Sequence, residues 1–507
     1  MDYSASSCAR TTDPLSYTRL TTCALIQYNQ GHTDPKTPYD GERFRPKSRI
    51  KDPVFLIIFL VQFAGFCVVS VLALSTWISQ GGLGGGLGGD NTGTSVTLDR
   101  HTVYLLLFVI ATALLLSVSY LILARAYTKL TVHLSLILSI LLNVGICIYY
   151  YIMKYWCNRS NYFHGHCLVS ILSYAGFRSR IPLASLLLQV VMDISKHHKS
   201  VFVVALTTLL LQAALSVYAT TTYAKWTPGN PACSGSTSCS SGTVAGLVFF
   251  ETFSYIWTSM VISNVSLTTL AGGPFGSAFY WYYFGPREAG LMPKHPTLSS
   301  FWRASTLSLG SIAFGSLIVT VLEITRLLLS ALRNNANAEG HPVEACLACC
   351  AECFIGCVEG MVQYFNRYAY IEIALYGKPY IRAAKDTWNL FQDRGIDALV
   401  NDSLVSITLT WGAYAVGMLC SLFGFLYLRY THPSYNDQGQ YTAPVVLFSF
   451  VIGVQLQLTL GAAIEAGVST IFVGLGEDPG ILAVRAPELF GMIADRYPHV
   501  VQGVPRV

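Results

Sequence analysis

The sequence contains few charged residues: they make up 12% of the chain, whereas hydrophobic residues make up 52%. Soluble globular domains usually carry about twice that charged fraction. A chain so poor in charge cannot cover its surface in water. This composition excludes a string of ordinary soluble domains and indicates that the chain is embedded in a membrane.

Missing motifs exclude further classes of function. The sequence has no nucleophile elbow, no phosphate-binding loop and no convincing set of metal ligands, so we expect no enzyme, no metal and no cofactor. The net charge of +5 is not concentrated in a basic patch with interleaved aromatic residues. Nucleic acid is therefore not expected as a partner.

Long hydrophobic segments predict an all-α, polytopic integral membrane protein with about ten transmembrane helices. A spanning helix needs about 20 largely apolar residues, because lipid offers no partners for unpaired backbone groups. The predicted spans are residues 54–78, 102–124, 131–153, 167–193, 201–224, 243–270, 299–330, 346–372, 403–429 and 442–470. The fourth and eighth segments contain charged residues, so an eight-span arrangement stays open.

The charge distribution predicts the domain organisation and the orientation. Residues 1–50 are polar, contain several prolines and lack the pattern of a signal peptide, so we expect a disordered cytosolic tail. Residues 51–472 form the expected transmembrane transport domain, and residues 473–507 a cytosolic C-terminal tail. Most of the 32 lysine and arginine residues fall on the same side of the spans as the N-terminus, which predicts that both termini are cytosolic.

Two predicted outer loops carry cysteine pairs. Cys157 and Cys167 flank a glycosylation sequon at Asn158, and Cys233 and Cys239 lie in the loop after the fifth span. Disulfides persist on the oxidising side of a membrane, so these residues predict two disulfides and a glycosylated loop outside the cell. Four free thiols are the alternative.

A carboxylate in the sixth span is the candidate site for a cationic substrate. Glu251 and Tyr255 are four residues apart and share a helix face, with Trp257 close by. A carboxylate beside aromatic rings suits a quaternary ammonium group, because cation–π contacts replace lost hydration. Trp411 and Tyr414, in the ninth span, are a candidate second aromatic wall. An interfacial aromatic belt or ordinary helix packing is the alternative.

Other charges in the predicted spans are candidate gating or structural groups. Arg178 and Arg180 precede Pro182 in the fourth span, where they form a gate, an anchor for an anionic group, or a structural pair with a carboxylate. Glu323 and Arg326 are three residues apart in the seventh span, so we expect them to neutralise each other. For each of these residues a structural role is favoured over a substrate site.

Three further features were weighed. Gly272, Gly273 and Pro274 predict a hinge at the inner end of the sixth span, with a plain loop as the alternative. His133 and Glu465 are weaker candidates for proton coupling, because a lone histidine is more often a structural residue. The last feature is a stripe of cysteines at helical spacing, which indicates helix packing or acylation near a membrane interface rather than zinc binding. We call it the cysteine stripe: Cys346, Cys349, Cys350, Cys353 and Cys357.

Several stretches resemble one membrane-protein family. Residues 364–378 and 383–386 are similar to the signature of the choline transporter-like family. Further matching pieces are residues 180–182, residues 309–316, the cysteine stripe, and residues 467–473 before Glu477. The short first outer loop and the long polar N-terminal tail resemble the fungal branch, the pH-nine-sensitive proteins, more than the animal members.

The resemblance implies a ten-span plasma-membrane protein with both ends in the cytosol. In animal relatives it also implies uptake of choline or ethanolamine without nucleotide hydrolysis. The leading hypothesis is therefore facilitated uptake of a small organic cation, choline or a related amine, by a protein whose other partners are membrane lipids. Handling or flipping of lipid headgroups and a non-transporting membrane scaffold are the alternatives. The oligomeric state stays open.

Overall fold

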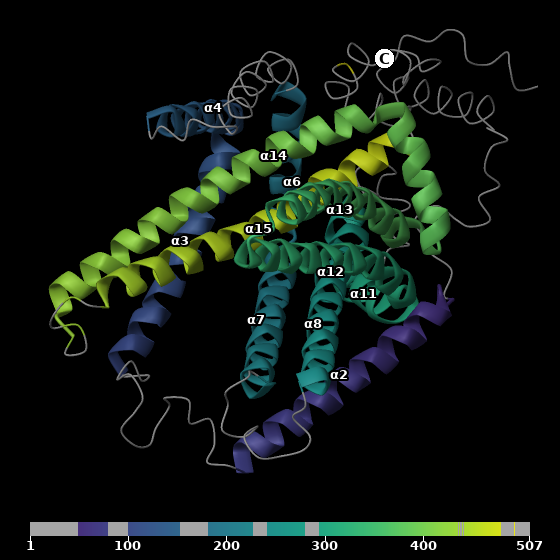
Figure 1. Cartoon of the computed structure of the whole chain (residues 1–507). Coiled ribbons are helices and arrows are strands. Elements are labelled where there is room, and N and C mark those ends of the chain that lie inside the picture. Colours follow the sequence, from purple (N-terminus) through teal and green to yellow (C-terminus); the bar gives the residue numbers. More distant parts are fainter. Residues whose placement is uncertain are drawn as a thin grey trace, which may run out of the picture.

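The computed structural model describes residues 49–79, 100–152, 181–226, 241–278, 294–433, 436, 439, 441–477 and 491, and the regular structure within them is helical. Figure 1 shows how the helices are arranged. The helices are α2 (Pro53–Ser79), α3 (Arg100–Ala126), α4 (Thr128–Ile152), α6 (Ile181–His197), α7 (Ser200–Trp226), α8 (Ser241–Leu270), α11 (Pro296–Trp302), α12 (Leu309–Glu339), α13 (Pro342–Tyr376), α14 (Tyr380–Thr431) and α15 (Thr442–Glu477). Two π-helical turns, η1 (Ala271–Phe275) and η2 (Arg303–Leu307), continue α8 and α11.

The predicted all-α membrane fold is confirmed. Within the described residues, nine helices are long and apolar enough to cross a membrane, which is one more than the eight-span arrangement allows. They correspond to nine of the ten predicted spans. The remaining predicted span is described from Ile181 onward, as α6. The two predicted tails lie almost wholly outside the described residues.

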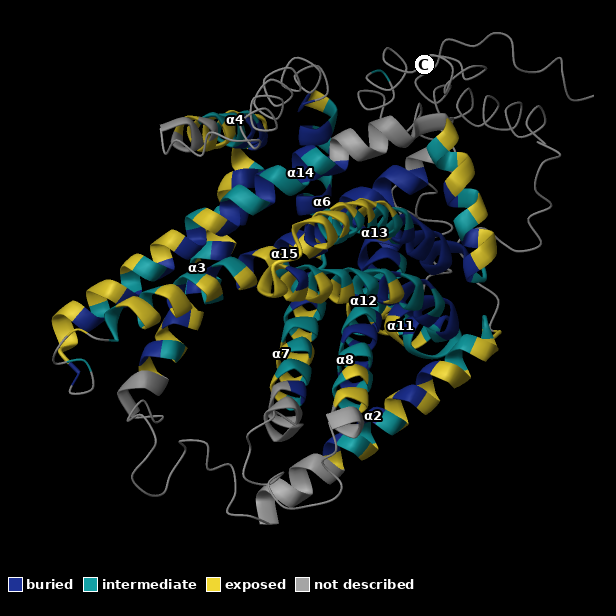
Figure 2. Ribbon diagram, viewed as in Figure 1, coloured by how far each residue is buried: buried dark blue, intermediate teal, exposed yellow. Residues whose placement is uncertain are grey.

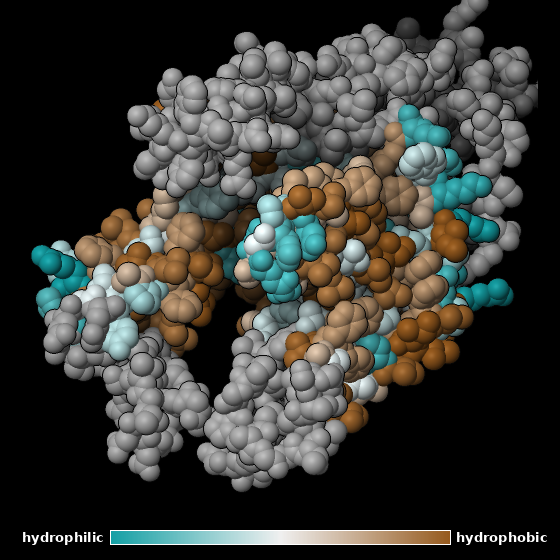
Figure 3. All heavy atoms as spheres, in the orientation of Figure 1, coloured by the Kyte–Doolittle hydropathy of each residue, from teal (hydrophilic) through white to brown (hydrophobic). Residues whose placement is uncertain are grey.

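The surface of the bundle is apolar, as expected for a protein whose solvent is lipid. Val61 of α2, Leu115 of α3 and Leu210 of α7 are 68%, 68% and 70% exposed. Exposed residues line the outer faces of α2, α3 and α14 in Figure 2, and Figure 3 shows that much of this surface is hydrophobic. In water such a surface would be unstable, whereas a bilayer covers it without cost.

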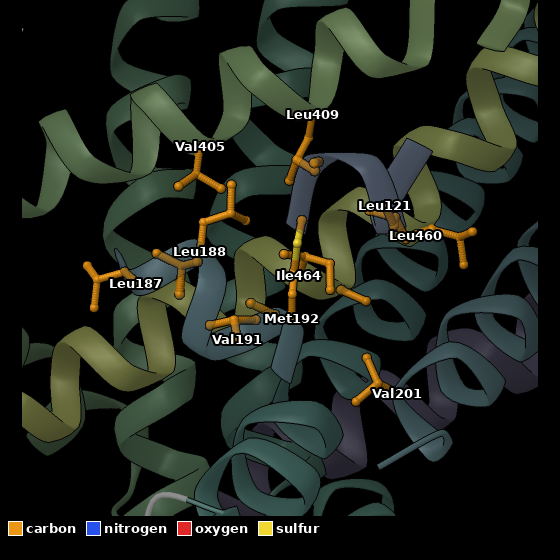
Figure 4. Packing of buried hydrophobic residues seen from close by; sticks show 14 of the residues in the cluster. Leu121, Leu187, Leu188, Val191, Met192, Val201, Val405, Leu409, Leu460 and Ile464 are labelled. Carbon is orange, nitrogen blue, oxygen red and sulfur yellow. The ribbon is translucent and has the colours of Figure 1, made fainter. Parts of the chain in front are cut away.

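The largest buried cluster joins α6 to the long pair α14 and α15. Leu188 and Val191 of α6 pack with Leu409 of α14 and Ile464 of α15, and Figure 4 shows their side chains gathered together. Small residues bring α14 and α15 close: a Cβ atom on Gly453 would lie 2.9 Å from the Cα of Gly417. Close backbone approach of this kind is typical of helix pairs in membranes.

Helices α12 and α13 form a hairpin that is held by ion pairs. Arg333 pairs with Glu352 at 2.6 Å, and Arg326 pairs with Glu359 at 2.9 Å. These pairs explain how the eighth predicted span, α13, accommodates Glu352 and Glu359, because each faces an arginine of α12. The turn between the helices is at Gly340, whose φ of 78° suits glycine.

The predicted hinge at the end of α8 coincides with η1. Pro274 lies inside this π-helical turn, and the helix continues through it instead of ending in a plain loop. The glycines allow close packing, because a Cβ on Gly273 would lie 2.9 Å from the Cα of Thr297. Whether the turn moves as a hinge stays a prediction.

Candidate functional site

A cavity of about 430 Å³ lies between α7, α8, α12, α13 and α15. All five of these helices are candidate membrane spans, so the cavity lies within the transmembrane part of the bundle. The volume falls in the range of about 300–1,000 Å³ that is typical of small-molecule sites. Its polar lining includes Thr208, Gln212, Ser263, Asn264, Gln363, Asn366, Arg367, Gln455 and Thr459.

Helical spacing directs these polar side chains to the cavity. On α13 the lining residues are Gln363, Asn366, Arg367 and Tyr370, at offsets of three, four and seven, which place them on one helix face. Polar groups inside a membrane are costly and usually mark a functional site. A stripe of four such residues in an apolar helix therefore identifies the cavity as the candidate site.

Three charged residues lie at the cavity wall and just behind it. The guanidinium of Arg367 pairs with Glu465 Oε2 at 3.4 Å and also interacts with the carboxylate of Asp402. Tyr368 Oη and Ser469 Oγ donate hydrogen bonds to Asp402 Oδ2 at 2.8 and 3.1 Å. With all three groups ionised the cluster carries a formal charge of −1, and Arg367 is the member that lines the cavity.

Hydrogen bonds hold the neighbouring polar groups in place. Asn366 Nδ2 donates to the carbonyl of Gly315 at 3.0 Å, while Tyr380 Oη donates to Asn366 Oδ1 at 2.5 Å. Asn264 Nδ2 lies 3.4 Å from Tyr370 Oη. Among the described residues that line the cavity, Tyr370 supplies the one aromatic ring. These contacts fix the ring and the amides before any substrate arrives, which lowers the entropic cost of binding.

The predicted substrate residues of α8 lie away from this cavity. Trp257 is buried, donates from Nε1 to the carbonyl of Ala313 at 3.1 Å and packs against Phe59. Tyr255 Oη shares a hydrogen bond of 2.9 Å with Ser216 of α7. The cavity-lining residues of α8 begin at Met260. Glu251 precedes Met260 by about two and a half helical turns, which places its side chain on the opposite face of α8.

Glu251 is fully buried, and its carboxylate has no hydrogen-bond partner among the described residues. Ser70 of α2 lies beside it, but the Ser70 hydroxyl donates to the carbonyl of Phe66. No other charged residue occurs in the spanning parts of α2, α7 and α8. An isolated carboxylate in such surroundings is costly when ionised, which favours its neutral form.

The second predicted aromatic wall lies elsewhere. Trp411 Nε1 donates to Ser139 Oγ of α4 at 2.6 Å, and its ring meets that of Tyr414 edge to face at 5.9 Å. Tyr414 is 41% exposed. The structure thus does not bring this pair together with Glu251, and none of the five predicted residues lines the cavity. Their role in substrate binding stays a prediction.

The remaining predicted residues divide into two groups. Arg326 of α12 pairs with Glu359 of α13, and Glu323 lies close enough to interact with both of these charges. The charge of Arg326 is therefore neutralised by a neighbouring helix as well as by Glu323 of its own helix. The other group lies outside the described residues, and its predicted roles stay predictions: Arg178, Arg180, Asn158, Cys157, Cys167, Cys233 and Cys239.

The cysteine stripe lies on the open face of α13. Cys346, Cys350, Cys353 and Cys357 are exposed and Cys349 is half-buried, and all five thiols are free. The stripe therefore does not pack against another described helix. Nowhere in the described ranges do three or more histidine, cysteine or acidic residues come together in a group that could hold a metal ion.

The cavity residues were not predicted as a site, although part of the signal was present. Residues 363–370 lie at the start of the stretch that carries the family resemblance, and Glu465 was considered and set aside. The detectable sign was the polar stripe at offsets of three, four and seven within an apolar span. What the sequence could not provide was the position of Glu465 and Asp402 beside Arg367.

Comparison with known proteins places this architecture in a family. The family model described as plasma-membrane choline transporter matches residues 162–480. Protein PNS1 of Cryptococcus neoformans var. neoformans is 56% identical over 473 residues, which cover 92% of this chain and 85% of the relative. Protein PNS1 of Mycosarcoma maydis is 41% identical over 491 residues (94% and 89%), and that of Candida albicans 35% over 489 residues (94% and 93%). This is a family of transporters and not of enzymes, and the chain, a multi-pass membrane protein with fungal relatives of the pH-nine-sensitive type, belongs to the choline transporter-like family.

Proposed function

We propose that this protein takes up a small organic cation, choline or a related amine, by facilitated transport across the plasma membrane, with both termini in the cytosol. The cavity between α7, α8, α12, α13 and α15 is the proposed substrate site. The observation that carries the proposal is the polar cavity of about 430 Å³, with Arg367 in its lining and the carboxylates of Glu465 and Asp402 behind Arg367.

The cavity offers what a quaternary ammonium group needs. Such a group cannot donate a conventional hydrogen bond, so its hydration must be replaced by nearby negative charge and by aromatic faces. Glu465 and Asp402 supply the charge, and Tyr370 supplies the ring. The side-chain amide oxygens of Gln363, Asn366 and Gln455 can accept a hydrogen bond from the hydroxyl group of a substrate such as choline. Apolar residues of the same cavity, including Leu267 and Val319, suit the methyl groups.

An interior-negative membrane potential is sufficient to drive this uptake. Moving one positive charge inward is favourable by about 2.3 kcal/mol per 100 mV, so neither nucleotide hydrolysis nor a coupled ion is required. The matching family, described as plasma-membrane choline transporters, supports both the substrate class and the location.

Uptake of labelled choline by proteoliposomes tests the proposal. The full chain is reconstituted into vesicles with an imposed interior-negative potential, and initial uptake is compared with that of protein-free vesicles. Faster uptake that is inhibited by unlabelled choline supports the proposal, and uptake no faster than in protein-free vesicles rejects it. Movement of a labelled lipid between leaflets in the same vesicles, without choline uptake, would instead support handling of lipid headgroups.

A further inference from the structure

A second pocket lies where α2 begins, at the end of the bundle opposite the α12–α13 turn. It encloses about 10 Å³ and is lined by residues from the segment before α2, from α8, α11 and η2, and from the end of α13. Three of its residues are basic, namely Arg49, Lys51 and Arg303, and none of the described residues that line it is a carboxylate. We call this site the basic pocket.

Arg303 is the most deeply placed of the three cations. Its Nη2 donates to the carbonyl of Gly272 at 3.3 Å, while its Nε is shielded from solvent and has no partner in the described part of the chain. Burial lowers the pKa of Arg303 from its usual range, because desolvation disfavours the charged form. A buried guanidinium in this state is better satisfied by an anion than by the protein alone.

The acidic residue next to the pocket is already engaged. Asp52 Oδ2 accepts hydrogen bonds from Ser311 Oγ at 2.6 Å and from the backbone N–H of Tyr380 at 2.9 Å. This carboxylate ties the start of α2 to α12 and α14. Asp52 is not among the residues that line the pocket.

The surroundings place the basic pocket at the depth of lipid headgroups. Trp302, directly before Arg303, is 66% exposed, and Leu298 and Phe301 of the same short helix are exposed too. Exposed tryptophan at the end of a membrane bundle marks the interface between hydrocarbon and headgroups. Ile50 and Val54 at the start of α2 are also exposed, so the pocket has an apolar rim on two sides.

The size of the pocket limits which chemical group can bind in it. A space of about 10 Å³ holds about one water-sized atom. One oxygen of a phosphate fits there, while the rest of the molecule stays outside. A free anion would gain little from such a shallow site, whereas a lipid is already held at the correct depth by its acyl chains.

We propose that the basic pocket binds the phosphate group of an anionic membrane lipid. The sequence before α2 supports this, because Arg43, Arg45 and Lys47 continue the basic run, and such runs beside a spanning helix attract anionic lipids. The pocket joins elements that already touch: Lys51 N–H donates to the carbonyl of Leu307 at 2.8 Å. A bound phosphate therefore ties the start of α2 to η2 and strengthens this end of the bundle.

Thermal unfolding of the full chain in two kinds of vesicle tests the proposal independently of any transport. One kind contains phosphatidylcholine alone, and the other contains phosphatidylcholine with about one fifth phosphatidylserine. Preferential binding to the folded state should raise the unfolding midpoint in the anionic vesicles by on the order of 3 °C. The Arg303→Gln and Arg49→Gln variants should lose this shift, and the Arg49 variant changes an exposed residue that folding does not need.

The matched control is Lys385→Gln, which removes an exposed positive charge of α14 that does not line the basic pocket. This variant should keep the shift. Equal midpoints in the two kinds of vesicle, or an undiminished shift in both pocket variants, would overturn the proposal. Inorganic phosphate added to phosphatidylcholine vesicles is the last arm. If it reproduces the shift, the site binds free phosphate and the assignment to lipid is wrong.

Discussion

Replacing Glu465 by glutamine tests the electrostatic account of the cavity. The substitution keeps the shape of the side chain and removes one negative charge beside Arg367, so the cluster of Arg367, Asp402 and residue 465 changes from a formal charge of −1 to zero. For a cation about 7 Å away at an effective dielectric constant of about 20, the lost attraction is about 2 kcal/mol. This corresponds to about a 30-fold weaker affinity.

The fold should survive this change. Arg367 keeps its interaction with Asp402, and the side chain of Arg367 is 33% exposed, so loss of the pair should cost less than the 3–5 kcal/mol typical of a fully buried pair. The assay is initial uptake of labelled choline by proteoliposomes at a fixed potential, over a range of concentrations. We expect the KM of Glu465→Gln to rise by about 30-fold.

A second ion pair provides the matched control. Glu352→Gln removes a carboxylate from the Arg333–Glu352 pair of the α12–α13 hairpin, whose residues do not line the cavity. Its KM should stay within about twofold of the parent, because its charge is screened and distant. If Glu465→Gln folds and leaves KM unchanged, or if Glu352→Gln raises it equally, the electrostatic account of the cavity is refuted.

Three further outcomes follow from the geometry. Glu251→Gln should leave the thermal midpoint equal or higher, because it removes a buried carboxylate that has no hydrogen-bond partner among the described residues; a drop of several degrees would show a partner that this account lacks. Asn366→Ala should lower the free energy of unfolding by about 2–3 kcal/mol, because it leaves the Gly315 carbonyl and the Tyr380 hydroxyl unpaired. The control Asn335→Ala, at an exposed residue, should lower it by less than about 0.5 kcal/mol. Equal thermal midpoints for the two variants would contradict this prediction. A membrane-impermeant maleimide should label the exposed Cys346 on intact cells, because the predicted orientation places this residue on the outer side. If peptide mapping finds the label on Cys346 only after the cells are permeabilised, the predicted orientation is wrong.

The span count was predictable because lipid imposes a simple rule on sequence. Each predicted segment within the described residues became a helix, and the boundaries of α2, α7 and α8 agree within a few residues. Even the eighth segment, doubtful because of Glu352 and Glu359, is a helix, since its charges pair with α12. Length and apolarity decide this outcome, and neither depends on tertiary contacts.

The site was harder to predict because it depends on which helix faces are neighbours. Glu251 and Trp257 satisfy the chemistry of a cation site, yet packing turns them toward other helices. Arg367, Glu465 and Asp402 come from three helices and meet only in the folded bundle. Periodicity shows which residues share a face of one helix, but it does not show which helices adjoin.

The α12–α13 hairpin has a practical consequence. At a rise of about 1.5 Å per residue, helices of 31 and 35 residues are about 46 and 52 Å long, well beyond a hydrocarbon core of about 30 Å. The turn at Gly340 has open space around it. A compact reporter domain inserted there, continuous with both helices, would serve as a rigid marker for aligning single-particle images of the molecule.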